Sequence, residues 1–404
     1  MNIDVEALVG KARRGFWLSI LSSFGDRSNC SLDYNWSRKS KLCYTYIKTN
    51  RRSSDSPSPI NCASTNTNIH MTNSDLQVWK GQKVKSRPKV SVIMPAYNVA
   101  QYIPEALDSV FRQSFRDFEV IVVNDGSPDT DELERVLEPY RDEIVYAKQR
   151  NAGVSAARNT AVRLANSPFI AQLDPDDAWL PEYLEVQMEL MLGDPTLDVL
   201  YPNTIIFGDT YDSGSHGMSL SPSDGEVTFE SVLSQKCNVL ACVVARRDTL
   251  IRVGLFDESL KSSEDFDMWI RILKSGGRIG YHRRVLARYR RRRDSLSASP
   301  IVICKSVLQT LAKLEHSLPL TDGERESLSQ SRFRFEAMLS LHEGKKAFFE
   351  GNHAAAIERL RNANRYYRSV KISVSLALLG IAPNLMLTLY NARDRFVFRA
   401  NTKY

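Results

Sequence analysis

The chain has 404 residues, of which 43% are hydrophobic, and this is enough for one large soluble domain with additions. Its six cysteines are scattered without a CxxC pair, so they indicate neither a zinc site nor a disulfide framework, and we expect reduced thiols in a cytosolic compartment. The net charge of +7 favours an anionic partner, but charge alone does not choose among phosphate, nucleic acid and acidic lipid.

Residues 1–87 differ in composition from the rest of the chain. From Lys48 to Lys89 the sequence is dominated by Ser, Asn, Thr, Pro, Lys and Arg, which bury too little apolar surface to offset the entropy of ordering. We therefore expect a disordered or dispensable extension, with Met71 as an alternative start. The run FWLSILSSF at 16–24 is only faintly similar to a secretory leader, because it is short and no cleavage site follows closely.

Strands and helices alternate from residue 88 onward. Short apolar runs predict buried strands at VSVIMP (90–95), FEVIVV (118–123), 144–147 and PFIAQL (168–173). Between them, apolar residues recur at helical spacing: Ile103, Leu107, Val110 and Phe111; Leu133 and Val136; Val154, Ala157, Ala161 and Leu164. This alternation predicts an α/β fold with a mostly parallel sheet covered on both faces. Ligands of such sheets bind beyond the carboxyl ends of the strands, where PAYN, NDGS and DPDD all lie.

The DPDD segment places Asp174, Asp176 and Asp177 directly after a predicted strand. Aspartates at i and i+2 can share a hard divalent cation such as Mg²⁺ or Mn²⁺, which in turn binds diphosphate oxygens. The alternatives are a solvated turn or a cap for a helix that begins near Pro181. A calcium loop is set aside, because Trp179 stands where that loop needs glycine.

Four segments in series, VSVIMPAYN, VIVVNDGSPD, NAGVSAARN and AQLDPDD, closely resemble the family 2 glycosyltransferases with the GT-A fold. The resemblance covers roughly residues 88–297. It implies a Rossmann-like GT-A domain at 88–300 that moves a sugar from a nucleoside-diphosphate sugar of the UDP or dTDP type to a hydroxyl group with inversion. The acceptor would be a glycan or a lipid-linked glycan in cell-surface polysaccharide or glycoconjugate synthesis, and no nucleic-acid partner is expected.

The resemblance also implies which residues contact the nucleotide of the donor. Pro95, Tyr97 and Asn98 would line the base and ribose, and Asp125 would accept a hydrogen bond from the base. Arg158 would reach the nucleotide, since its cationic fork suits ribose or phosphate oxygens. An ordinary turn at NDGS and a solvated helix residue at Arg158 are the structural alternatives.

The same resemblance implies which residues lie near a divalent cation. Asp174 matches the carboxylate near the ribose and the metal, and Asp176 matches the direct ligand of Mg²⁺ or Mn²⁺. Asp177 would support them or cap a helix. Relatives often carry a histidine where this chain has Arg292, in YRRRRDSLS. Arginine cannot ligate a metal but can neutralise diphosphate, and the basic residues around it could also bind lipid phosphates or be solvated.

The segment SSEDFDMWIRIL resembles the family's Glu-Asp motif, which supplies the catalytic base. Asp265 would take the acceptor's proton, Glu264 would support it, and Trp269 would stack against the acceptor sugar. We expect Ile270 and Leu273 to form the buried side of this helix. The alternative is simply a negatively charged helix N-terminus.

Residues 301–404 have a continuous helical pattern. Small residues in EGKKAFFEGNHAAAIERLRNA (343–363) predict one tetratricopeptide-like helix pair, either capping the enzyme or packing on a second copy. The apolar run 372–390 has basic flanks but is interrupted by polar residues, Gly380 and Pro383. It predicts a helix on an anionic membrane surface or, equally, a helical hairpin; a spanning helix is less favoured. We expect a cytoplasmic protein, with attachment to the inner membrane face left open.

Two functions from other classes remain open on sequence alone. A sugar-nucleotide pyrophosphorylase also has an α/β sheet, but its Gly-rich, Arg- and Lys-containing signature is absent after VSVIMP. A non-catalytic scaffold could use the C-terminal helices for partners. The sugar, the acceptor and the oligomeric state are not determined by these patterns.

Overall fold

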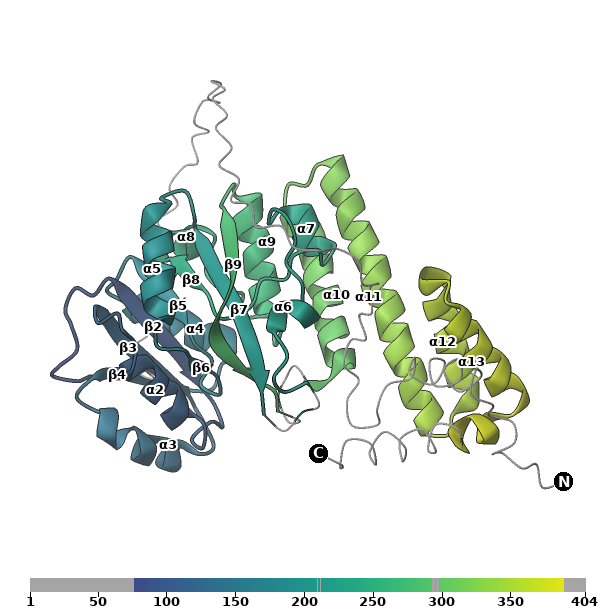
Figure 1. The fold of residues 1–404 in the computed structure, drawn as a ribbon, viewed down its shortest axis with the longest axis horizontal. Coiled ribbons are helices and arrows are strands. Elements are labelled where there is room, and N and C mark those ends of the chain that lie inside the picture. The colour runs from purple at the N-terminus through teal and green to yellow at the C-terminus, as the bar shows by residue number, and fades with distance from the viewer. Residues whose placement is uncertain (1–75, 209, 211, 293–294, 296–297, 389–404) are drawn as a thin grey trace, which may run out of the picture.

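The computed structural model describes residues 76–208, 210, 212–292, 295 and 298–388 (Figure 1). The sheet strands are β1 (Gln77–Lys80), β2 (Val90–Ala96), β3 (Phe118–Asp125), β4 (Ile144–Gln149), β5 (Phe169–Gln172), β6 (Ala178–Trp179), β7 (Val199–Phe207), β8 (Val244–Arg246) and β9 (Ile279–Arg290). The helices of the first part are α2 (Ile103–Phe111), α3 (Thr130–Leu137), the 3₁₀ turn η1 (Glu138–Tyr140), α4 (Val154–Leu164), α5 (Tyr183–Gly193), α6 (Gly217–Leu220), α7 (Phe229–Leu233), α8 (Arg247–Arg252) and α9 (Glu264–Lys274). Four helices follow: α10 (Pro300–Ser317), α11 (Asp322–Phe349), α12 (His353–Tyr367) and α13 (Val370–Ile381).

The described strands form one sheet in the order β1-β4-β3-β2-β5-β8-β7-β9-β6. Strands β4, β3, β2 and β5 are mutually parallel, and β7 is parallel to β9. The other pairs, β1–β4, β5–β8, β7–β8 and β6–β9, are antiparallel. The predicted α/β class is therefore confirmed, and the parallel part of the sheet is the part that the apolar runs identified.

Alternating side chains of the central strands feed two cores, because successive residues of a strand point to opposite faces. Ile93 and Ile121 join a core with α4, α7 and α9 on one face. Val92 and Val122 join a second core with α2, α3 and α5 on the other face. Both faces of the strands are thus buried, which explains why these strands are apolar throughout.

The C-terminal helices divide into two parts. Helices α10 and α11 contribute Leu311, Leu314 and Leu328 to the same core as α4 and α9. The residues of α12 and α13 instead form a small separate core with the end of α11, through Phe348, Leu360 and other residues. In Figure 1 this second pair lies at the end of the molecule farthest from β3 and β4. The first two helices therefore extend the sheet domain, and the last two do not.

The small residues of the expected helix pair lie where α11 meets α12. Gly344 faces Leu360 so closely that an added Cβ would come within 3.0 Å of its side chain. Ala356 and Ala363 are buried in the same contact. Of the expected apolar stretch 372–390, the described part forms α13 up to Ile381. In the part of the chain described here, no helix is both long and apolar enough to cross a membrane.

Some predictions lie outside the described residues. These are residues 1–75 of the extension expected at 1–87, with the leader-like run and the alternative start at Met71, and the segment beyond residue 388. For residues 76–87 the prediction of a disordered extension is wrong, because β1 pairs with β4 and the backbone N–H of Gly81 donates to the carbonyl oxygen of Ile144 at 3.0 Å. The described cysteines, Cys237, Cys242 and Cys304, are free and buried, as expected for reduced thiols.

Candidate active site

Three neighbouring parallel strands bring the predicted donor-side residues to one edge of the sheet. The end of β2 continues into Tyr97, which is 51% exposed, and Asn98, which has the left-handed backbone angle φ 54°. Pro95 is buried inside β2 and so shapes the strand rather than offering a surface. The backbone N–H of Asn98 donates to Ser127 Oγ at 2.7 Å, which ties the loop after β2 to the loop after β3.

Asp125 ends β3 and holds the loop that precedes α4. Its Oδ1 accepts hydrogen bonds from Gln149 Nε2 at 2.7 Å and from the backbone N–H of Ala152 at 2.9 Å. Its Oδ2 accepts from the N–H of Gly153 at 2.7 Å, where φ is 94° and glycine is favoured. Each carboxylate oxygen has two lone pairs, so Oδ2 keeps the capacity to accept from a nucleotide base.

Arg158 of α4 gathers three carboxylates and is only 2% exposed. Its Nη1 donates to Glu264 Oε1 at 2.5 Å and to Asp265 Oδ1 at 3.2 Å, and its Nη2 donates to Asp174 Oδ1 at 2.9 Å. The guanidinium also lies over the ring of Phe256, 5.5 Å from its centre. We call Arg158, Asp174, Glu264 and Asp265 the Arg158 cluster. The structure thus joins the DPDD loop to the first turn of α9 through one arginine.

The Arg158 cluster carries an excess of negative charge, because three carboxylates face one guanidinium. Burial and the charges of Glu264 and Asp174 raise the pKa of Asp265 to about 7, even though Arg158 opposes the rise. The side chain of Asp265 is still 25% exposed, whereas that of Glu264 is 9% exposed. Asp265 is therefore both accessible and able to exchange a proton near neutral pH, as a general base requires.

The expected nucleotide contact of Arg158 remains a prediction. Both of its Nη atoms already bind carboxylates, and Nε has no hydrogen-bond partner among the described residues. The observed partners indicate that Arg158 orients the carboxylates, and its Nε is buried.

The remaining two aspartates of DPDD are held by the end of β9, which pairs with β6. Asp177 Oδ1 accepts from the backbone N–H of Arg290 at 2.7 Å, and Arg290 Nε donates to the carbonyl oxygen of Asp176 at 2.7 Å. Arg292 Nε lies 3.0 Å from Asp176 Oδ2 in an ion pair. Burial, followed by the charge of Asp174, raises the pKa of Asp176. Burial and the neighbouring aspartates raise the pKa of Asp177 well above its usual range.

These carboxylates fit a hard divalent cation in their chemistry. Their oxygens are the donors that Mg²⁺ and Mn²⁺ prefer. Within the described residues, no three Asp, Glu, His or Cys side chains form a group that could hold a metal ion by themselves. A cation at Asp176 and Asp174 would therefore need oxygens from a ligand or water to complete its coordination.

The basic run on β9 is engaged with carboxylates in the structure. Arg288 donates to Glu105 at 2.9 Å, Arg290 also binds Glu105, and Arg291 binds Asp212. This pairing favours a role in holding the DPDD loop over binding to lipid phosphates. Sequence reasoning missed Glu105 and the part that Arg290 plays, because their partners are distant in sequence.

The prediction for Trp269 is wrong. Trp269 is 2% exposed and lies in the core beneath α9, so it has no face to offer an acceptor sugar. Helix α9 buries Met268, Ile270 and Ile272 as well, and Leu273 is only partly buried. The prediction that Ile270 and Leu273 form the buried side was therefore too narrow, because more of the helix surface is buried.

Comparison with known sequences identifies the matched part of the chain. The sequence model described as glycosyl transferase family 2 matches residues 91–256. An uncharacterized glycosyltransferase, MJ1057, of Methanocaldococcus jannaschii is 30% identical over 213 residues, which cover 50% of this chain and 71% of that protein. The minor teichoic acid biosynthesis protein GgaB of Bacillus subtilis is 29% identical over 252 residues, covering 57% of this chain and 27% of GgaB. The chain spans only 28% to 59% of the length of rickettsial glycosyltransferases that it matches at about 30% identity.

Solved structures share the fold. TarS residues 1–349 from S. aureus, in complex with UDP, has a TM-score of 0.50 at 20% identity, covering 69% of this chain and 91% of that one. The mannosyltransferase PcManGT from Pyrobaculum calidifontis, in complex with GDP-Man and Mn²⁺, also has a TM-score of 0.50, at 19% identity, covering 78% and 90%. The GT-A architecture expected from the sequence is confirmed by these similarities.

Proposed function

The chain belongs to the family 2 glycosyltransferases, and we propose that it transfers a sugar from a nucleoside-diphosphate sugar to an acceptor hydroxyl group with inversion. The observation that carries this proposal is the Arg158 cluster, in which one arginine brings the partly exposed Asp265 together with Glu264 and with Asp174 of the sheet edge, and burial raises the pKa of Asp265 to about 7. A carboxylate that is half ionised at neutral pH can accept a proton without being locked in either state.

In the proposed reaction, the acceptor oxygen attacks the anomeric carbon of the donor sugar. The bond from that carbon to the diphosphate oxygen breaks on the opposite face, and the hydroxyl proton passes to Asp265. Arg158 Nη1 holds Asp265 through the contact at 3.2 Å and holds the adjacent Glu264 through the contact at 2.5 Å. A single displacement of this kind inverts the configuration at the anomeric carbon.

The leaving diphosphate carries most of the developing charge, so its stabilisation is the larger energetic requirement. We assign that work to the end of β9 and the DPDD loop. Arg292 forms an ion pair with Asp176, and its guanidinium can also neutralise charge on a diphosphate bound beside it. Mg²⁺ or Mn²⁺ held by Asp176 and Asp174 would supply further positive charge at the phosphate oxygens.

The donor proposal draws on the chemistry of the edge and on relatives. Exposed Tyr97 offers a stacking face, and Oδ2 of Asp125 can accept from an imide N–H of uracil or thymine. TarS was solved with UDP, and PcManGT with GDP-Man and Mn²⁺. We propose a UDP- or dTDP-sugar donor and, by similarity to GgaB and to an Escherichia coli chondroitin synthase, an acceptor in polysaccharide or teichoic acid synthesis.

Nucleotide release tests the proposal directly. The protein is incubated with UDP-, dTDP- and GDP-sugars and Mn²⁺, with and without oligosaccharide acceptors. We expect nucleotide release that depends on the metal and is lost in Asp265→Asn. Release that requires added pyrophosphate would indicate a pyrophosphorylase, and no binding of any nucleotide sugar, by thermal shift, would contradict the proposal.

We also propose peripheral attachment to the inner face of a membrane for the helices α12 and α13. From Arg359 to Thr388 the chain has five basic residues and no acidic one, and Val370 and Ile381 of α13 are 72% and 85% exposed. Basic charge beside exposed apolar side chains suits an anionic lipid surface. Cosedimentation with phosphatidylglycerol vesicles but not with phosphatidylcholine vesicles is expected, and equal recovery with both, or with neither, would contradict it.

A further inference from the structure

The start of α9 depends on the loop before it. Helix α9 begins at Glu264 directly after Ser263, whose backbone is left-handed with φ 62°. Two of the three carboxylates that meet Arg158, Glu264 and Asp265, are the first two residues of the helix. Any movement of residues 253–263 therefore moves Glu264 and Asp265 with it.

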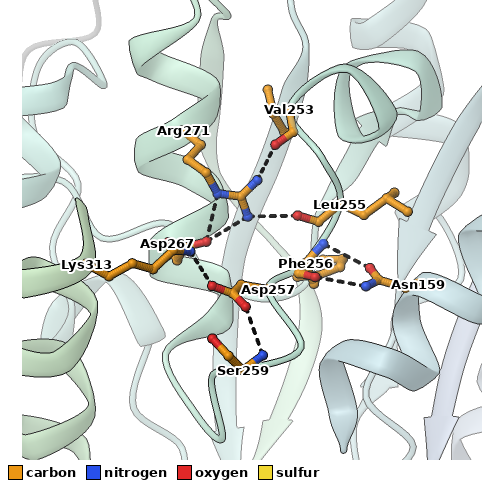
Figure 2. A network of polar contacts seen from close by, with 9 residues as sticks. All are labelled: Asn159, Val253, Leu255, Phe256, Asp257, Ser259, Asp267, Arg271 and Lys313. Atoms are coloured by element: carbon orange, nitrogen blue, oxygen red, sulfur yellow. Dashed lines mark hydrogen bonds and ion pairs between the residues drawn. The ribbon is translucent and has the colours of Figure 1, made fainter. Parts of the chain in front are cut away.

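One side of this loop is fastened to α4. Asn159, the neighbour of Arg158, donates from Nδ2 to the carbonyl oxygen of Phe256 at 2.8 Å, and its Oδ1 accepts from the N–H of Phe256 at 2.9 Å. The same amide donates to Glu258 at 2.8 Å. Figure 2 shows the paired bonds between Asn159 and Phe256.

The other side is fastened by the next turn of α9 and by α10. Arg271 donates from Nη1 to the carbonyl oxygen of Val253 at 2.5 Å and from Nη2 to that of Leu255 at 2.8 Å. Its Nε donates to Asp267 Oδ2 at 2.8 Å. Lys313 of α10 donates to the other oxygen of Asp267 at 2.8 Å and also binds Asp257 in the loop (Figure 2). We call Asp257, Asp267, Arg271 and Lys313 the Asp267 cluster.

Lys313 thus joins three parts of the molecule. Its ammonium group connects α10 to the fully buried Asp267 of α9 and to Asp257 of the loop. Burial opposes ionisation of Asp257, but hydrogen bonds from Lys313 and Ser259 outweigh it and lower the pKa of Asp257 to about 2, so this carboxylate stays ionised at neutral pH. A second contact lies near the end of the loop, where Ser306 Oγ of α10 donates to the carbonyl oxygen of Ser262 at 2.7 Å.

We propose that Lys313 is a positioning residue for sugar transfer: it fixes residues 253–263 from α10 and thereby places Asp265 against the acceptor. It lies outside the segment 91–256 that the family sequence model matches. The role rests on the proposed function, because it concerns the placement of the same base. It makes α10 part of the transferase unit and not merely a cover for its core.

Lys313→Met removes the ammonium group and keeps most of the side chain's length. A displacement of Asp265 on the order of 1 Å should lower kcat by roughly tenfold to 100-fold. The dissociation constant for UDP should stay unchanged, since Tyr97 and Asp125 lie on other elements. Lys313→Arg, which retains a cation, should recover most of the lost kcat.

Lys274→Met is the matched control. Lys274 of α9 pairs with Glu324 of α11 at 2.7 Å, and its side chain is 18% exposed, against 31% for Lys313. It also ties α9 to a C-terminal helix, but Glu324 is not in the loop. Its loss should lower stability to a similar extent and leave kcat near the wild-type value.

The outcomes separate the possibilities. Equal kcat in Lys313→Met and Lys274→Met, both folded by circular dichroism, would overturn the positioning role. If Lys313→Met does not fold, Asp257→Asn removes the loop's half of the pair, and unchanged kcat there would overturn it as well. If wild-type protein binds no nucleotide sugar, the proposed function fails instead, and the two failures are distinguished by the binding measurement.

Discussion

Helix α9 carries two clusters of buried charge, and they differ in balance. In the Arg158 cluster, three carboxylates share one guanidinium, and the pKa of Asp265 is raised to about 7. In the Asp267 cluster, two carboxylates face Lys313 and Arg271, and the pKa of Asp257 falls to about 2. Equal numbers of positive and negative groups stabilise the folded structure. An excess of carboxylates raises the pKa of one of them, so that it can accept a proton near neutral pH. The comparison therefore separates the residues that react from those that position them.

The largest effect is expected for Asp265→Asn. The amide cannot accept the acceptor's proton, so kcat should fall by roughly 100-fold to 10,000-fold. Stability should not fall, because the change removes one of three crowded carboxylates. Steady-state transfer assays, with UDP affinity from calorimetry, measure both. Undiminished turnover would remove Asp265 from its assigned role.

Asp267→Ala, unlike Asp265→Asn, should lower the stability of the protein. Asp267 is fully buried between Arg271 and Lys313, and its removal leaves two cations without their shared carboxylate. The free energy of unfolding should fall by about 3–5 kcal/mol, as for other broken buried pairs. Urea denaturation of this variant and of Asp265→Asn provides the comparison. Equal stability in the two variants would show that the clusters do not differ as described.

The two clusters should also respond to pH in different windows. The pKa of Asp265 is about 7 in the folded protein and about 4 in an unfolded chain, so the native state binds more protons between these values. Its contribution to the free energy of unfolding therefore declines as pH rises from about 4 to about 7. Asp257, with a lowered pKa of about 2, contributes stability that is present above about pH 4 and lost as pH falls toward 2.

Denaturation curves measured from pH 3 to pH 8 test this difference. Asp176, Asp177, His282 and His342 also have shifted pKa values but are present in every variant, so the test is the difference from wild type. The difference in the free energy of unfolding between wild type and Asp265→Asn should decline from pH 4 to 7, and that between wild type and Asp257→Asn should not. A difference between wild type and Asp265→Asn that stays constant from pH 4 to 7 would contradict the raised pKa of Asp265.

The sequence predicted the parallel strands β2 to β5 because local patterns determine them, but it did not predict β1, β7 or β8. The buried strands at 90–95, 118–123 and 144–147 lie where β2, β3 and β4 are found, and the helix with Ile103 and Phe111 at its ends matches α2. The two-residue strand β6 was not predicted, because it is too short to show a pattern and exists only by pairing with β9.

The candidate site was predicted in part. Arg158, Asp174, Glu264 and Asp265 were expected to serve one substrate site, and the structure brings all four together, but the direct pairing of Arg158 with the carboxylates was not predicted. The Asp267 cluster was not foreseen, because Lys313 meets Asp267 across 46 residues of sequence and no periodicity reports such a contact. Trp269 was misassigned because a position on a helix does not reveal which neighbours cover it.

The smallest expected effect is that of Tyr97→Ala. Tyr97 belongs to neither cluster and is half exposed at the end of β2, where a base could stack on its ring. Loss of that stacking should weaken UDP binding by about twofold to tenfold, with no change in stability or in the pH profile. Isothermal titration calorimetry measures the change, and Phe at this position should retain the affinity.

The most direct test of the account is the ionisation of Asp265 itself. Carboxyl infrared absorption is recorded from pH 4 to pH 9 for the wild type, and the Asp265→Asn spectrum is subtracted at each pH. The account predicts a carboxyl-to-carboxylate conversion with a midpoint near pH 7. A midpoint near pH 4, the ordinary value for aspartate, would contradict the claim that the unmatched Arg158 cluster prepares this residue to accept a proton.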